Sequence, residues 1–191
     1  MLWKLLLPLV FPICLLAQQE PPTLALSPYG SYHGYGPALG FRPSFGYGFH
    51  VIYSPLPRTA ISARISLSRT SVEFDLINAQ DRIDVGVISY QLGIRQQTAS
   101  VGSLFDIDLS GNVGMIRFVR EAKTISLGAL GTTVIPEKTD TRSIYSVGVI
   151  LSRAIGSRVS IDVMPEVQFI SPLSERQGNY SISGGLAIGI L

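Results

Sequence analysis

Residues 103–120 read SLFDIDLSGNVGMIRFVR, and along this stretch apolar and polar residues alternate with a period of two. Odd positions carry the apolar members Phe105, Ile107, Leu109, Val113, Met115 and Val119. Even positions carry the polar members Asp106, Asp108, Ser110 and Asn112. This alternation predicts a β-strand with one apolar and one polar face. Two architectures use such strands: a soluble β-protein with its apolar faces inside, and a membrane barrel with its apolar faces toward lipid.

The amino-terminal residues predict a signal peptide. Met1 to Lys4 form a short positive region, Leu5 to Ala17 an apolar region, and polarity returns at Gln18. The apolar region is shorter than the roughly 20 residues that a membrane-spanning helix needs. We therefore expect residues 1–17 to be removed on export and residues 18–191 to form a single domain. The only cysteine, Cys14, would leave with the signal, so the exported chain could form neither a disulfide nor a thiolate metal site.

The composition excludes two classes of protein. The chain is 46% hydrophobic and 15% charged, yet after the signal no apolar run approaches the length of a helical membrane span. Helical membrane proteins are therefore excluded. The net charge of +2 is small and evenly scattered, so nucleic acid is not an expected partner.

Turn residues divide the rest of the chain into segments that alternate in the same way. Seven segments are clear, at 44–54, 59–76, 85–97, 103–120, 141–153, 158–170 and 180–191, and an eighth is expected within 23–39. The short connections are 54–58, 98–102 and 154–157, and they alternate with longer ones at 78–84, 121–140 and 171–179. Short and long connections thus fall on opposite ends, as in barrels with tight periplasmic turns and longer external loops. The sequence predicts an all-β fold, a single antiparallel up-and-down transmembrane barrel of about eight strands.

The facing of each strand favours the same fold. Side chains expected to face lipid include Phe45, Tyr47, Ile65, Leu92, Val149 and Ile161. Those expected inside include His50, Ser62, Gln91, Ser146, Gln168 and Ser181, so the whole interior is expected to be polar or small. The alternative is a soluble periplasmic lipocalin-like barrel, whose surface we would expect to be richer in Lys and Thr.

Four stretches carry a family resemblance. They are the Gly-rich opening, RPSFGYGFHVIYSPLPRTAISARISL at 42–67, YSVGVILSRAIGSRVSIDVMPEVQF at 145–169 and NYSISGGLAIGIL at 179–191. Together they resemble the outer-membrane β-barrel domain family of bacteria, which groups porin-like and outer-membrane protein X or A-like eight-stranded barrels. The resemblance implies a location in the outer membrane, with its lipids and its assembly machinery as partners. The chain departs from the family in ending at Leu191 instead of the aromatic residue that the assembly machinery reads.

Charged residues at inward positions form the best candidate site. The network comprises Arg64, Arg95, Asp106, Asp108, Arg142, Arg158, Asp162 and Glu166. Arg95 and Asp106 flank the 98–102 turn, and we expect them to form an ion pair because cross-strand neighbours lie about 4.5–5.5 Å apart at Cβ. A desolvated charge without a partner is costly, and an eight-stranded barrel is just wide enough to be filled by side chains. The network therefore predicts a largely closed lumen; the alternative is a gated, narrow conduit for ions or small solutes.

No motif points to catalysis, a cofactor or a metal. Asp106 and Asp108 could form an acid–base pair, but they face a lumen too narrow for a substrate, beside arginines that would hold them ionised. The histidines are His33 and His50, and His50 falls on the lumen face, which favours a structural imidazole over a general base. The glycine-rich stretches lack the strand–helix context of a dinucleotide site, and no metal-ligand spacing is present. We therefore expect a protein that is not an enzyme and has no cofactor.

Two function classes remain open. The first is a structural or interaction barrel whose external loops carry recognition, chiefly the loop from Glu121 to Asp140; its ligand is not indicated. The second is a narrow porin. The segment TISLGALGTTVIP within this loop, residues 124–136, is apolar between charged flanks. It either forms a binding surface or merely prolongs the flanking strands into an external hairpin with Gly131 near its tip.

Overall fold

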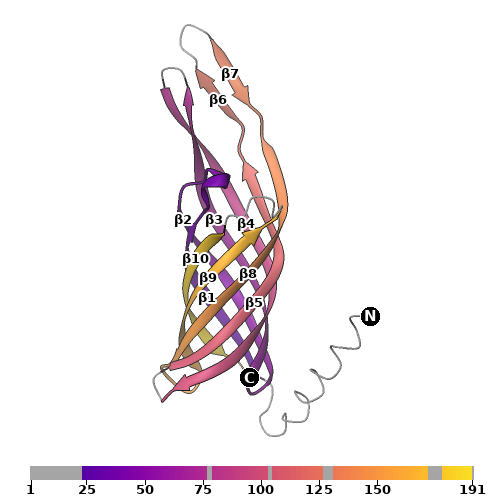
Figure 1. Ribbon diagram of the computed structural model, residues 1–191, viewed down its shortest axis with the longest axis vertical. Coiled ribbons are helices and arrows are strands. Elements are labelled where there is room, and N and C mark those ends of the chain that lie inside the picture. Colours follow the sequence, from indigo (N-terminus) through magenta and orange to yellow (C-terminus); the bar gives the residue numbers. More distant parts are fainter. Residues whose placement is uncertain (1–22, 77–78, 103–104, 127–130, 172–177, 191) are drawn as a thin grey trace, which may run out of the picture.

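The chain folds into a closed antiparallel barrel, seen in a computed structural model that describes residues 23–76, 79–102, 105–126, 131–171 and 178–190 (Figure 1). The barrel strands are β1 (Thr23–Gly34), β2 (Ser44–Leu56), β3 (Thr59–Leu76), β4 (Ala79–Val101), β5 (Phe105–Arg120), β8 (Lys138–Ala154), β9 (Val159–Ile170) and β10 (Asn179–Gly189). Their order around the barrel is β1-β10-β9-β8-β5-β4-β3-β2. The prediction of an all-β barrel of eight strands is confirmed, and the weakly patterned eighth strand is β1. The predicted signal peptide lies outside the described residues.

Each barrel strand pairs with the barrel strand that follows it along the chain, with β8 following β5, and β1 and β10 close the barrel. Their register runs from Ala25 opposite Gly189 to Gly34 opposite Tyr180. The connections β2–β3, β4–β5 and β8–β9 lie at one end, here called the tight-turn end (Figure 1). The opposite end, here called the loop end, carries the β1–β2 connection with the short 3₁₀ helix η1 (Pro37–Leu39), the β3–β4 hairpin and a second hairpin.

Two predicted connections are instead strand. Of the expected loop 78–84, residues 79–84 belong to β4, which pairs with β3 as far as Leu76 opposite Ala79. The expected turn 98–102 is mostly strand as well, because β4 continues through a register shift between Gln97 and Ala99 to Val101. Apolar–polar alternation fades where a hairpin projects beyond the barrel wall, since neither of its faces needs to be apolar there. Backbone pairing continues regardless of that pattern.

The second hairpin at the loop end is formed by β6 (Lys123–Ser126) and β7 (Thr132–Ile135). These strands pair with each other, from Lys123 opposite Ile135 to Ser126 opposite Thr132, in a sheet of their own. Gly131 has a positive φ of 94°, a conformation that glycine adopts without strain. The interpretation that this loop forms a hairpin is thus confirmed for the residues described, and its external position and a binding role stay predictions.

The exterior of the barrel is apolar and most of the interior is polar. Residues predicted to face outward are exposed, as at Phe45 (79%) and Leu92 (63%), whereas inward ones such as Ser62 and Ser181 are buried. The facing prediction is therefore confirmed. The expectation that the interior is polar or small throughout is wrong, because apolar side chains are also buried there. The largest group of them lies at the loop end.

Candidate functional site

The lumen side chains form layers, of which the first, near the tight-turn end, is centred on Arg95. Its Nε donates to Asp108 Oδ2 from the neighbouring strand, and its Nη1 donates to Asp162 Oδ2 across the lumen at 3.0 Å. Ser152 Oγ accepts from Arg95 Nη2 at 2.6 Å and donates to Asp162 Oδ1 at 2.9 Å. One guanidinium therefore holds β4, β5, β8 and β9 together from inside the barrel.

A cavity with a mixed polar and apolar lining lies between this layer and the tight-turn end. It has a volume of about 230 Å³, and its lining includes Arg58, Gln97, Asp106, Asp108, Ser160 and Asp162. A second, much smaller cavity of about 20 Å³ lies deeper and shares Arg95 and Asp162 with the first. Its wall includes His50, whose Nε2 has no hydrogen-bond partner within the described part of the chain.

The second layer is the buried ion pair between Arg64 on β3 and Glu166 on β9. Arg64 Nη2 donates to both carboxylate oxygens, at 2.9 and 2.7 Å, and the two side chains are 4% and 1% exposed. Arg64 Nε and Nη2 also donate to Gln91 Oε1, and Nη2 donates to Ser146 Oγ. An ion pair removed from water to this degree is sustained only when further hydrogen bonds satisfy both partners.

Glu166 receives those further bonds from β9 and β10. Gln168 Nε2 and Ser181 Oγ each donate to Glu166 Oε1 at 2.6 Å, and Gln168 also donates to Ser181. On the other side, Asn112 Nδ2 donates to Ser146 Oγ at 3.1 Å. Polar residues from β3, β4, β5, β8, β9 and β10 thus meet in one network that crosses the middle of the lumen.

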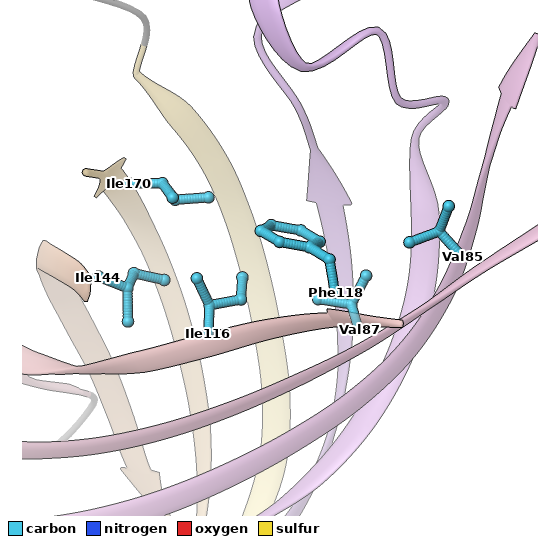
Figure 2. Packing of buried hydrophobic residues seen from close by; sticks show 6 residues of the cluster. All are labelled: Val85, Val87, Ile116, Phe118, Ile144 and Ile170. Carbon is cyan, nitrogen blue, oxygen red and sulfur yellow. The ribbon is translucent and has the colours of Figure 1, made fainter. Parts of the chain in front are cut away.

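The third layer is apolar and lies at the loop end. It consists of the buried side chains Val85, Val87, Ile116, Phe118, Ile144 and Ile170 from β4, β5, β8 and β9 (Figure 2). The partly buried side chains of Leu39, Phe41 and Val72 pack against it. Sequence reasoning missed this layer, although the even positions of β5 continue inward from Asn112 to Ile116 and Phe118.

The β1–β2 connection is fixed over this apolar layer. The ring of Phe41 lies 5.1 Å from that of Phe118, and Phe41 forms a β-bridge with Val72. The backbone N–H of Arg42 donates to Ser71 O at 3.0 Å, and Thr70 Oγ1 donates to Arg42 O. The connection is therefore attached to β3 by both backbone and side-chain contacts.

Five of the eight predicted network residues contribute to the two polar layers. They are Arg64, Arg95, Asp108, Asp162 and Glu166. The predicted ion pair between Arg95 and Asp106 is wrong, because β4 continues past the expected turn and places Ser100 opposite Asp106. Asp106 is exposed and accepts hydrogen bonds from Gln97 Nε2 and Ser100 Oγ.

The other two predicted members lie at the ends of the barrel. Arg142 donates to Asp140 Oδ2 at 2.7 Å on its own strand, near the loop end. Arg158 is exposed in the β8–β9 connection, one residue before β9 begins, so it is not part of a lumen layer. Both departures have the same cause. The alternation along a strand predicts whether a side chain points into the lumen, but not how far it lies from the ends of the barrel. These two residues lie where the barrel opens to solvent.

The histidines are both buried, and His33 is the next-to-last residue of β1, toward the loop end. His33 Nε2 is 2.9 Å from Ser31 Oγ, and His50 lies opposite Arg64 in the β2–β3 ladder. Among the residues described, no group of three or more His, Cys, Asp or Glu is arranged to hold a metal ion. The same residues include no helix that is both long and apolar enough to cross a membrane.

A closed antiparallel barrel with an apolar outside and a polar lumen has the fold of transmembrane β-barrels. Solved structures of that class resemble it. Neisserial surface protein A matches with a TM-score of 0.63 and 13% identity, over 88% of this chain and 99% of that one. OprG from Pseudomonas aeruginosa matches with a TM-score of 0.57 and 7% identity, over 91% and 98%. A major outer membrane protein from Thermus thermophilus also has a TM-score of 0.57, with 11% identity over 87% and 99%.

These identities establish similarity of fold alone. No protein-family model and no curated protein matches the sequence. What the barrel does must therefore be argued from its own residues.

Proposed function

We propose that this protein is an outer-membrane barrel whose wall and filled lumen serve as an anchor, and whose loop-end hairpins carry recognition. The observation that supports it most strongly is the series of layers inside the barrel. The Arg64–Glu166 network crosses the lumen with side chains that are almost fully buried, and the apolar layer lies above it. A solute would have to break a desolvated ion pair and then enter an apolar constriction.

The proposed location in the outer membrane is based on the residues that cover the outside of the barrel. The exposed large side chains on the barrel wall are aliphatic and aromatic, an arrangement that suits lipid and would expose an unusually large apolar surface to water. The predicted signal peptide supplies export. Membrane lipids and, during biogenesis, the outer-membrane assembly machinery are accordingly the proposed partners.

The proposed recognition surface is the pair of hairpins at the loop end, which project beyond the rest of the barrel (Figure 1). In β7, Thr132, Thr133 and Val134 are exposed. Long connections on a rigid scaffold are where binding residues usually lie. Catalysis is not part of the proposal, because the buried carboxylates are engaged by arginines and the histidines face the interior.

A narrow porin is the second candidate. The cavity of about 230 Å³ near the tight-turn end favours it, because the charged residues in its mixed lining could hold water and ions. A conduit would require a continuous path from that cavity past Arg64 and Glu166 to the loop end.

Location and orientation can be tested by single-cysteine labelling in intact cells. In a Cys14→Ser background, Thr133→Cys places a thiol on β7 and Ser157→Cys places one in the β8–β9 connection. We expect a membrane-impermeant maleimide to label the first variant in intact cells and the second only after lysis. Recovery of the protein in the soluble periplasmic fraction, or labelling of Ser157→Cys in intact cells, would contradict the proposal.

A further inference from the structure

On β3 and β5, the two strands that flank β4, the apolar exterior gives way to arginines toward the loop end. The outward residues of β3 are apolar up to Leu67, and the next outward residue is Arg69. The outward residues of β5 are apolar or glycine up to Met115, and the next outward residue is Arg117. On β4, between them, Gly86 leaves the outer surface without a side chain. Basic side chains therefore lie directly next to the apolar wall, on its loop-end side.

The strand register places these two arginines on either side of Gly86, whose missing side chain leaves an open space, here called the hollow. Arg69 is opposite Gly86 on one side, and Val119 is opposite Gly86 on the other. Arg117, two residues below Val119, is opposite Ile88. From strand spacing and rise, the Cα atoms of the two arginines are about 12 Å apart. A Cβ added to Gly86 would meet only the carbonyl oxygen of Val119, at 3.7 Å, so the hollow comes from the missing side chain.

Neither arginine is held firmly by the protein. Within the described residues, Arg117 makes no hydrogen bond or ion pair, and its cross-strand neighbours are Ile88 and Thr141. Arg69 pairs with Glu121 at 2.8 Å, but both side chains are about two-thirds exposed. Such a pair is weak and can exchange partners. Both guanidinium groups are thus available to a ligand.

The rest of the wall is different at this end. On β8, β9, β10, β1 and β2 the outward residues toward the loop end are aromatic: Tyr145, Phe169, Tyr180, Tyr32 and Phe45. The Tyr32 and Phe45 rings are 5.2 Å apart. Aromatic side chains of this kind line both interfaces of membrane barrels. On β3 and β5, the arginines Arg69 and Arg117 follow the last apolar outward residues instead.

We propose that Arg69 and Arg117 bind the phosphate group of an anionic lipid in the membrane leaflet at the loop end. The guanidinium group presents paired donors that match phosphate oxygens. The hollow at Gly86 accommodates part of the headgroup, and the acyl chains lie along Leu67, Ile88 and Met115. The inference rests on the membrane location proposed above and adds a lipid-specific site to it.

The charges that surround the hollow are mixed but favour an anion. Asp84 and Glu121 contribute carboxylates, whereas Arg82 and Lys123 join Arg69 and Arg117 as cations. Arg82, Asp84, Glu121 and Lys123 line an adjoining hollow of about 330 Å³. This hollow provides room for the polar part of a headgroup beyond the phosphate.

The test is lipid binding by the folded barrel, measured by native mass spectrometry. The probes are a bisphosphorylated lipid A and the same lipid after removal of its phosphates. The variants are Arg117→Gln, which removes the unpaired cation, and Gly86→Leu, which fills the hollow without a clash. Arg153→Gln is the matched control, since Arg153 is an outward arginine at the tight-turn end, 5.9 Å from the Phe105 ring.

We expect the unmodified barrel to bind the phosphorylated lipid more tightly than the dephosphorylated one. We expect Arg117→Gln to weaken that binding about tenfold, the effect of one lost charge-assisted contact. Gly86→Leu should weaken it to a similar degree by excluding the headgroup from the hollow, and Arg153→Gln should leave it unchanged. Any other pattern, including equal losses in all three variants, overturns the lipid site. Heat-modifiable gel migration is measured on every sample, so that failure to form the barrel, which would contradict the proposed function itself, is recognised separately.

Discussion

Replacing Glu166 by Gln would show how strongly the middle layer stabilises the barrel. The change keeps the shape of the side chain and removes the charge that two oxygens present to Arg64, at 2.9 and 2.7 Å. It also replaces one acceptor oxygen by an amide donor, while Gln168 and Ser181 still point their donors at this position. A buried guanidinium then loses its counter-charge, and at least one donor loses its acceptor.

We expect this variant to lose about 3–5 kcal/mol of unfolding free energy, the cost of leaving one partner of a buried ion pair alone. The double variant with Arg64→Met should recover most of the loss, because it removes the unpaired charge. Asp106→Asn is the control: this carboxylate is exposed, with Gln97 and Ser100 as its partners, and the change should cost less than about 0.5 kcal/mol.

The assay is reversible urea unfolding in phospholipid vesicles, followed by circular dichroism and by the gel band shift on heating. Tryptophan fluorescence is unsuitable because the only tryptophan, Trp3, lies in the predicted signal peptide. If Glu166→Gln costs no more than Asp106→Asn, the ion pair is hydrated and the reasoning about a desolvated middle layer is refuted.

Three further predictions concern the wall and the hairpins. Ile161→Arg on the lipid face should destabilise the barrel by about 2–4 kcal/mol, whereas Ile155→Arg in the tight turn should cost less than about 1 kcal/mol. Equal costs, measured by unfolding in vesicles, would contradict the placement of Ile161 against lipid. Gly114→Ala should cost about 1–3 kcal/mol of unfolding free energy, because the added Cβ would lie 1.9 Å from a backbone carbonyl oxygen of β4. In the control Gly111→Ala the added Cβ meets no atom within 4 Å, so this variant should be near neutral in the same assay. Replacing Thr124–Pro136 by a short Gly/Ser link should leave heat-modifiable migration intact, and loss of that migration would make the hairpin part of the barrel wall.

Facing could be predicted from the sequence because each side chain on a strand points opposite to its neighbours. The alternation from Phe105 to Val113 placed Asp108 and Asn112 inside, as observed. Applied further, it places Ile116 and Phe118 inside too. Apolar side chains are also expected on a lipid face, so these two residues are not recognised as interior, although their even positions on the strand predict it.

Pairing could not be predicted in the same way. Arg64 and Glu166 are 102 residues apart, and they meet only because closure of the barrel brings β3 and β9 to opposite sides of one lumen. Arg95 finds Asp108 instead of Asp106 because β4 continues past the expected turn and places Ser100, not Arg95, opposite Asp106. Whether a side chain points inward follows from its odd or even position on the strand. Its distance from the ends of the barrel and its partner depend on the stagger between strands, which the sequence pattern does not contain.

Ion conductance of the purified, folded protein in planar lipid bilayers tests the filled lumen most directly. The lumen is crossed by the Arg64–Glu166 network and by the apolar layer that includes Phe118. We predict no current steps above the bilayer baseline from a preparation that is fully heat-modifiable on gels. Steady current steps that disappear when the same preparation is unfolded by heat would contradict the closed lumen and establish the narrow porin in its place.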